Sequence, residues 1–104
     1  MTTRVLIIGG YGNFGTFISK RLAKTENIQI IIAGRSIAKA KALAAELNAE
    51  SCALDINQGM SAALASIAPD VVIHTSGPYQ TQAQIVAKAC IEQGCHYIDH
   101  RRWP

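Results

Sequence analysis

The chain has few charged residues and no long apolar run, and each shortage excludes a class of protein. Charged side chains make up 16% of its 104 residues, against 49% hydrophobic ones. This share is low for a fully solvated monomer, so we expect part of the surface to be covered. No apolar stretch approaches the roughly 18 residues of a membrane-spanning helix. A strand-like segment begins within a few residues of Met1, which leaves no room for a signal peptide.

Cysteine is also scarce. The three cysteines are Cys52, Cys90 and Cys95. An odd number at this spacing is not a disulfide framework, and the separation of Cys90 from Cys95 is not that of a zinc motif. We therefore expect reduced thiols, a cytoplasmic protein, no membrane partner and no metal.

Concentrated charge and catalytic groupings are missing too. The formal net charge is +3, and the basic residues are scattered apart from His100-Arg101-Arg102. This is no nucleic-acid footprint, and an anionic cofactor is the simpler partner. The sequence has no paired carboxylates and no nucleophile–base pair, so the catalytic residues stay unknown.

Glycine is what the chain does have, in an informative place. Residues 5–15 read VLIIGGYGNFG, a buried-strand run that leads into Gly10, Gly12 and Gly15 at the spacing G-x-G-x-x-G. A strand before the motif and helical spacing after it are the context of a dinucleotide-binding turn. We expect Gly10 to permit the tight turn, Gly12 to let the pyrophosphate approach, and Gly15 to let the helix pack on the strand.

The other residues of the turn leave alternatives open. Tyr11, Asn13 and Phe14 lie where they could touch the ligand, although the apolar helix stripe favours Phe14 as a core residue. Gly9, Gly12 and Gly15 also fit the spacing of short-chain reductases. That family is disfavoured because neither Tyr79 nor Tyr97 is followed by a lysine four residues later.

Strand and helix patterns alternate along the whole chain. We expect strands at 5–8, 28–33, 51–54, 71–74 and 96–99, and helices at 14–24, 37–48, 58–67 and 81–93. This order predicts an α/β fold of the Rossmann type, a doubly wound parallel sheet with strand order 3-2-1-4-5 and no second domain.

The end of the second strand predicts the cofactor. An NAD site places an acidic residue there, but the sequence reads Ala33-Gly34-Arg35-Ser36. Arg35 can pair with a 2′-phosphate and Ser36 can donate to it, so NADP is expected rather than NAD. Asp55 follows the third strand and is either an adenine ligand or an ordinary turn cap.

A second loop follows the fourth strand on the same sheet edge. Ser76, Gly77 and Pro78 are expected to line the cofactor towards its nicotinamide. His74 is expected to be a packed residue. Asp99 is expected to be a surface carboxylate at a strand end, with a place near the nicotinamide as the alternative.

These segments together resemble the N-terminal NAD(P)-binding domain of saccharopine dehydrogenase-like proteins. The resemblance rests on the glycine turn, A-G-R-S at 33–36, Asp55, H-T-S-G-P-Y at 74–79 and C-I-E-Q-G-C-H-Y-I-D at 90–99. It implies an oxidoreductase acting on amino-acid-derived imines and secondary amines. It also implies a larger second domain that supplies most of the substrate pocket.

The resemblance assigns places to the site residues. Pyrophosphate contact is implied for the residues Gly10, Gly12, Asn13 and Phe14. Arg35 and Ser36 are implied to lie at the adenosine ribose, and Asp55 near the adenine base. The resemblance places Ser76, Gly77 and Pro78 towards the nicotinamide.

We therefore expect a cofactor-binding domain over residues 1–99, with 100–104 as a tail or a truncated connection to an absent catalytic domain. Such a chain would bind NADP without turnover. It would also form a homodimer through apolar surface that the missing domain leaves exposed. The alternatives are a stand-alone nucleotide-binding or redox-sensing module, and a degenerate fragment without a ligand.

Overall fold

Strands and helices alternate from one end of the chain to the other in the computed structural model, which describes residues 2–75 and 80–99. The elements are β1 (Thr3–Ile8), α1 (Asn13–Ala23), β2 (Ile28–Gly34), α2 (Ile37–Leu47), β3 (Glu50–Ala53), α3 (Met60–Ile67), β4 (Val71–His74), α4 (Gln80–Gln93) and β5 (His96–Asp99). Each expected element is present, with ends that differ from the prediction by at most two residues.

The five strands form one parallel sheet in the order β3-β2-β1-β4-β5, which confirms the predicted fold class. Ile8 at the end of β1 is level with Ala33 on β2 and with His74 on β4. The loops that follow these three strands therefore begin side by side at one edge of the sheet. Ligands of such sheets bind at this carboxyl edge, where the strand order reverses.

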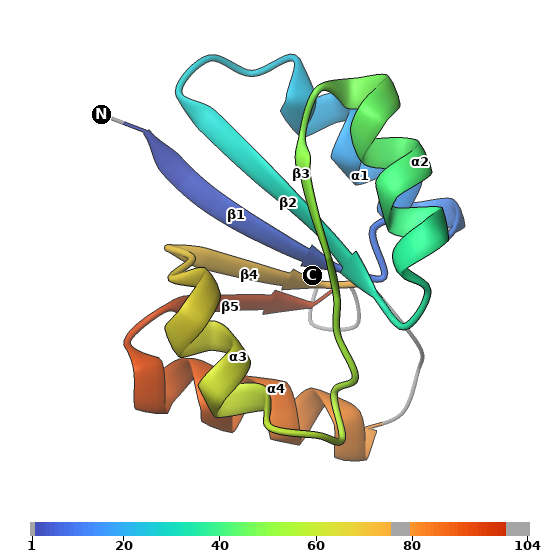
Figure 1. Cartoon of the computed structure of the whole chain (residues 1–104). Coiled ribbons are helices and arrows are strands. Elements are labelled where there is room, and N and C mark those ends of the chain that lie inside the picture. The colour runs from blue at the N-terminus through green and yellow to red at the C-terminus, as the bar shows by residue number, and fades with distance from the viewer. Residues whose placement is uncertain (1, 76–79, 100–104) are drawn as a thin grey trace.

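Helices cover both faces of the sheet, α1 and α2 on one side and α3 and α4 on the other (Figure 1). The side chains of β1 alternate between the two cores. Leu6 and Ile8 belong to the cluster under α3 and α4, whereas Val5 and Ile7 belong to the one under α1 and α2. Residues 5–8 of this central strand are all buried because both faces are covered, which is why this run of the sequence is continuously apolar.

Helix α1 corrects one prediction. Phe14 was expected in its buried stripe, but its exposed fraction is 46%, and that of Phe17, one turn further along the helix, is 62%. The buried residues of this helix are Gly15 and Ser19, and Ser19 donates a hydrogen bond to the Gly10 carbonyl at 3.1 Å. The helix lies so close to the sheet that only small side chains fit between them, so the phenylalanines lie beside the contact.

The amino edge of the sheet is closed by polar contacts of Arg4. Its guanidinium lies 3.1 Å from Glu50 on β3 and 2.8 Å from the Ile67 carbonyl at the end of α3. Its backbone N–H donates to Asp70 at 2.8 Å. No helix in the described part of the chain is long and apolar enough to cross a membrane.

Candidate functional site

A pocket of about 360 Å³ lies at the carboxyl edge of the sheet. It brings together the glycine turn, the ends of β2 and β3, and the start of α4. Its walls are formed by Ile8, Gly9, Tyr11, Gly12, Gly34, Arg35, Leu54, Asp55, Ile56, Thr75 and Gln82. Four of the predicted site residues are therefore in one cavity: Tyr11, Gly12, Arg35 and Asp55.

The tight turn after β1 is made by Gly9 and not by Gly10, which corrects the predicted role. Gly9 has φ 80°, and Gly10 is not among the positive-φ residues. Gly10 is a glycine because its surroundings are crowded. A Cβ there would lie 3.0 Å from Ile32 Cγ2 and 3.1 Å from the Ile7 carbonyl.

Gly15 allows the close approach of α1, as predicted. A Cβ at this position would collide with the Gly9 carbonyl and would lie 2.8 Å from both Gly10 Cα and Thr75 Oγ1. The first helical turn must therefore pack backbone against backbone.

Gly12 differs from its neighbours because the protein itself leaves room there. A Cβ on Gly12 would meet only the Gly9 carbonyl at 3.4 Å, an ordinary contact. Its φ of −73° suits any residue. Neither packing nor backbone conformation requires a glycine here, and its absence of a side chain leaves the main chain open to a ligand.

The positive end of the α1 helix dipole lies at the same place, next to Gly12. Gly12 is the N-cap and has no side chain to accept from the first N–H groups, and the first turn carries no acidic residue. Asn13, the first helical residue, is exposed. The positive end of the helix is thus left for an anion, and a pyrophosphate fits it.

Thr75 has a role at this site that the sequence prediction did not assign to it. Its Oγ1 lies 2.8 Å from the Ile8 carbonyl and 3.0 Å from the Gly9 carbonyl, and its N–H also donates to Ile8. The threonine thereby fixes the end of β4 to the glycine turn. Only the β1–β4 adjacency, which follows from strand order, could have suggested this contact.

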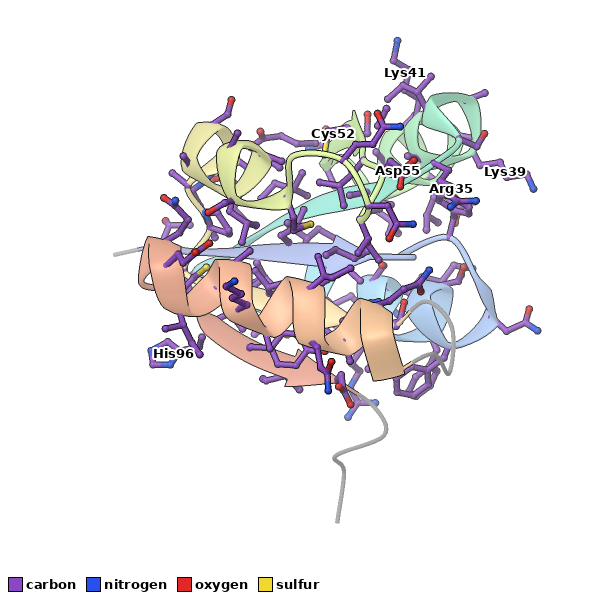
Figure 2. All side chains as sticks on the ribbon, turned by 90° about the horizontal axis from the view of Figure 1, so that it is seen from below. Arg35, Lys39, Lys41, Cys52, Asp55 and His96 are labelled. Atoms are coloured by element: carbon purple, nitrogen blue, oxygen red, sulfur yellow. The ribbon has the colours of Figure 1, made fainter. Side chains whose placement is uncertain are left out.

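The loop after β2 and the first turn of α2 carry two cations, Arg35 and Lys39. The Arg35 side chain is 73% exposed. Ser36 caps α2 as predicted, because its Oγ accepts from the Lys39 N–H at 3.2 Å. Arg35, Lys39 and Asp55 lie at one end of the molecule and His96 at the other (Figure 2). Lys39 is a second cation of this region that the prediction did not name.

Asp55 lies opposite Arg35 and also caps its own turn. Its Oδ1 accepts from the Asn57 N–H at 3.0 Å and lies 4.0 Å from an Arg35 guanidinium nitrogen. The turn-cap interpretation is therefore confirmed. Contact with adenine remains a prediction.

The predicted nicotinamide residues Ser76, Gly77 and Pro78 lie outside the described residues. Next to them, His74 is buried as predicted, with its Nδ1 3.2 Å from Tyr97 Oη. The expectation for Asp99 was wrong, because this carboxylate is 2% exposed and accepts from Tyr97 Oη at 2.8 Å. It lies on the same face as Tyr97, two residues away on the strand.

Two of the three cysteines, Cys52 and Cys90, are poorly suited to thiol chemistry. Burial, together with the neighbouring Cys95, raises the pKa of Cys90 to about 12. Burial, and secondarily the charge of Glu50, raises the pKa of Cys52. Thiolates are the reactive form, so these two thiols are unreactive near neutral pH. Among residues 2–75 and 80–99, no group of three or more His, Cys, Asp and Glu side chains could hold a metal ion.

Known structures share this arrangement. Saccharopine dehydrogenase (L-Glu forming) from Saccharomyces cerevisiae is 28% identical, with a TM-score of 0.81 over 93% of this chain and 21% of its own. Triphenylmethane reductase from Citrobacter sp., complexed with NADP(H), is 26% identical, with a TM-score of 0.73 over 91% of this chain and 36% of its own. The chain thus spans a minor part of either protein.

A third structure shows likeness of fold alone. It is a short-chain dehydrogenase/reductase from Veillonella parvula in complex with NADP, 13% identical, with a TM-score of 0.75 over 95% of this chain and 47% of its own. No curated protein sequence matches the chain.

The sequence matches the family described as the saccharopine dehydrogenase NADP binding domain over residues 5–102, which is nearly the whole chain. The match agrees with the strand order and with the pocket at the carboxyl edge, and it does not favour a redox-sensing module. The chain belongs to the saccharopine dehydrogenase NADP-binding domain family.

Proposed function

We propose that this chain holds NADP for an oxidoreductase whose substrate is bound by a part of the protein outside these residues. When bound, NADPH supplies a hydride. The observation that carries the proposal is the composition of the loop after β2, where Arg35 and Ser36 stand in place of the acidic residue of an NAD site. By themselves the 104 residues would bind the cofactor and turn nothing over.

The pyrophosphate would lie across the glycine turn. The residues proposed to hold it are Gly10, Tyr11, Gly12, Asn13, Phe14 and Gly15. The open space at Gly12 and the uncapped start of α1 support this part of the proposal. Backbone N–H groups at a helix N-terminus bind phosphate oxygens without any cationic side chain.

The 2′-phosphate would lie between Arg35 and Ser36. Arg35 and Lys39 bring two cations to the positive end of α2, whose first turn has no acidic residue. This arrangement is unfavourable for an empty helix end and becomes favourable once a dianion is bound. The Ser36 hydroxyl accepts from Lys39 N–H and keeps its own hydrogen for donation.

The two ends of the cofactor complete the proposal. The adenine would lie near Asp55, which lines the pocket. Ser76, Gly77 and Pro78 would lie towards the nicotinamide, an assignment supported by the family resemblance of their motif. Free thiols at Cys52, Cys90 and Cys95 support a cytoplasmic location.

Calorimetric titration of NADP and NAD tests the proposal. We expect wild-type protein to bind NADP more tightly than NAD. Arg35→Ala should weaken NADP by about ten- to a hundredfold, the worth of a hydrogen bond to a charged group, and should leave NAD within about twofold.

Lys41→Ala is the matched control for the loss of a cation. Lys41 lies on α2 and points away from Arg35 and Asp55 (Figure 2). We expect its removal to leave NADP affinity within about twofold. Tighter binding of NAD than of NADP by the wild type would refute the proposal.

We also propose that two copies of the chain associate. An apolar groove of about 450 Å³ lies between α1 and β5, lined by Phe14, Ile18, Arg21, Leu22, Ile73, Ile98 and Asp99. Phe14 and Ile98 are 46% and 42% exposed, a surface that favours contact with another apolar face.

A further inference from the structure

The side chain of Tyr11 joins two loops of the site. Tyr11 belongs to the glycine turn, but its Oη accepts a hydrogen bond from the backbone N–H of Ser36 at 3.0 Å. It is half-buried and lines the pocket together with Gly34 and Arg35. One side chain thus connects the turn proposed for the pyrophosphate with the loop proposed for the 2′-phosphate.

Gly34 gives a second, independent sign of this contact. A Cβ on Gly34 would lie 2.5 Å from Tyr11 Oη and 2.6 Å from Tyr11 Cζ. Gly34 is not among the positive-φ residues, so its backbone conformation does not demand glycine. The last residue of β2 is therefore a glycine because the tyrosine ring lies against it.

The hydrogen bond holds the residue that begins α2. Ser36 is fixed twice, through its N–H by Tyr11 Oη and through its Oγ by the Lys39 N–H at 3.2 Å. Arg35 lies directly before it, and its guanidinium is largely exposed. An arginine on an exposed loop binds well only if its backbone is already positioned, because ordering it on binding costs affinity.

We infer that Tyr11 is a positioning residue that sets the preference for NADP over NAD. It holds Arg35 and Ser36 where the 2′-phosphate binds, so its hydroxyl acts on this phosphate through the loop. NAD lacks the phosphate and depends much less on the position of these residues. The inference rests on the proposed function, specifically on the role of Arg35 and Ser36.

Tyr11→Phe tests it, because this variant keeps the ring against Gly34 and removes only the acceptor for the Ser36 N–H. We expect calorimetry to show NADP binding weakened by about three- to tenfold, the usual worth of one hydrogen bond, with NAD within about twofold. A purely structural role would weaken both cofactors alike. Equal losses for both cofactors, or no loss for NADP, would overturn the inference.

Tyr97→Phe is the matched control. It also removes a tyrosine hydroxyl, the one that donates to Asp99 at 2.8 Å. Tyr97 is on β5, three strands from β2 in the sheet order. We expect the ratio of the NAD and NADP dissociation constants to be unchanged. A fall in this ratio equal to that of Tyr11→Phe would overturn the inference.

The experiments distinguish failure of the proposed function from failure of the inference about Tyr11. If the wild type does not prefer NADP, or Arg35→Ala leaves the preference intact, then the proposed function fails and the inference fails with it. If Arg35→Ala abolishes the preference and Tyr11→Phe does not, the inference alone is wrong.

A double-mutant cycle on stability needs no cofactor. Gly34→Ala places a methyl group against the Tyr11 ring and should lower the melting temperature. In a Tyr11→Ala background the same substitution finds the ring gone, so its effect should fall by more than half. Additive effects would show that Gly34 and Tyr11 act separately and would overturn the inference.

Discussion

The glycines of the β1–α1 turn have different roles, which differ in what a single added methyl group would contact. At Gly15 a Cβ collides with the Gly9 carbonyl, so the helix must move away from the sheet. At Gly12 a Cβ meets only one ordinary contact, so the empty protein tolerates it. Packing therefore requires Gly15, whereas Gly12 is assigned to the cofactor by the proposed function.

The two alanine substitutions should therefore have opposite signatures. Gly15→Ala should lower the free energy of unfolding by about 1–3 kcal/mol, the cost of overpacking. Gly12→Ala should lower it by no more than about 1 kcal/mol, the usual advantage of glycine over alanine at an N-cap. The same Gly12→Ala should weaken NADP at least about tenfold, because the methyl group lies where the pyrophosphate approaches.

Urea unfolding and calorimetry measure both quantities. The assignment of Gly12 to the cofactor would be wrong if Gly12→Ala bound NADP as the wild type does. It would also be wrong if this variant lost as much stability as Gly15→Ala.

Residue roles were predicted well where they follow from a local sequence pattern. They were predicted poorly where they depend on contacts between residues far apart in the sequence. Ser36 follows from its position before an apolar periodic segment, and it caps α2. The contact of Tyr11 with Ser36 spans 25 positions, and that of Thr75 with Ile8 spans 67. No pattern in the sequence encodes which side chains meet after the strands pair.

At the scale of elements, the end of α3 carries strain that one substitution can remove. Its C-cap, Ala68, has φ 53° and ψ 54°, the left-handed conformation, and its N–H donates to the Leu64 carbonyl. A side chain with a Cβ pays roughly 1–2 kcal/mol to adopt this conformation. Pro69 follows immediately, so the helix cannot continue and relieve it.

Ala68→Gly should raise the free energy of unfolding by about 1 kcal/mol, because glycine adopts positive φ freely. Ala65→Gly is the matched control. Ala65 is exposed within the same helix, and there the identical change should lower stability by about 0.5–1 kcal/mol. Urea unfolding of both variants checks the sign. A loss of stability for Ala68→Gly would contradict the strained cap.

The elements themselves could be predicted because periodicity and turn residues agree along the chain. The buried face of α1 could be predicted only in part, because Ile18 and Leu22 pack against the core as expected and Phe14 and Phe17 do not. Its sequence offers Phe14, Phe17, Ile18 and Leu22 as an apolar stripe, but the distance between helix and sheet decides which residues face inward. Gly15 and Ser19 are the buried residues of this helix because they are small enough to fit between helix and sheet. Hydrophobicity alone carries no information about that distance.

At the scale of the whole molecule, the sheet order followed from the alternation of strand and helix and from the right-handed connection rule. The exposed side of α1, which the sequence prediction placed in the core, has a consequence for association. Phe14 and Phe17 are exposed beside the groove that reaches to Ile98 on β5. Because the helix turns these rings away from its own core, they are available to another surface.

Association through this groove predicts a concentration-dependent dimer. Phe17 is 62% exposed and lies one turn from Phe14 on one side and from Arg21 on the other, both of which line the groove. Phe17→Glu places a charge there without touching the core, so light scattering at high micromolar concentration should show a monomer, against a dimer for the wild type. Ile91→Glu is the control, because Ile91 is 81% exposed on α4, across the sheet from α1. The Ile91→Glu variant should remain dimeric. A monomeric wild type would refute association through this face, and so would equal effects of the two variants.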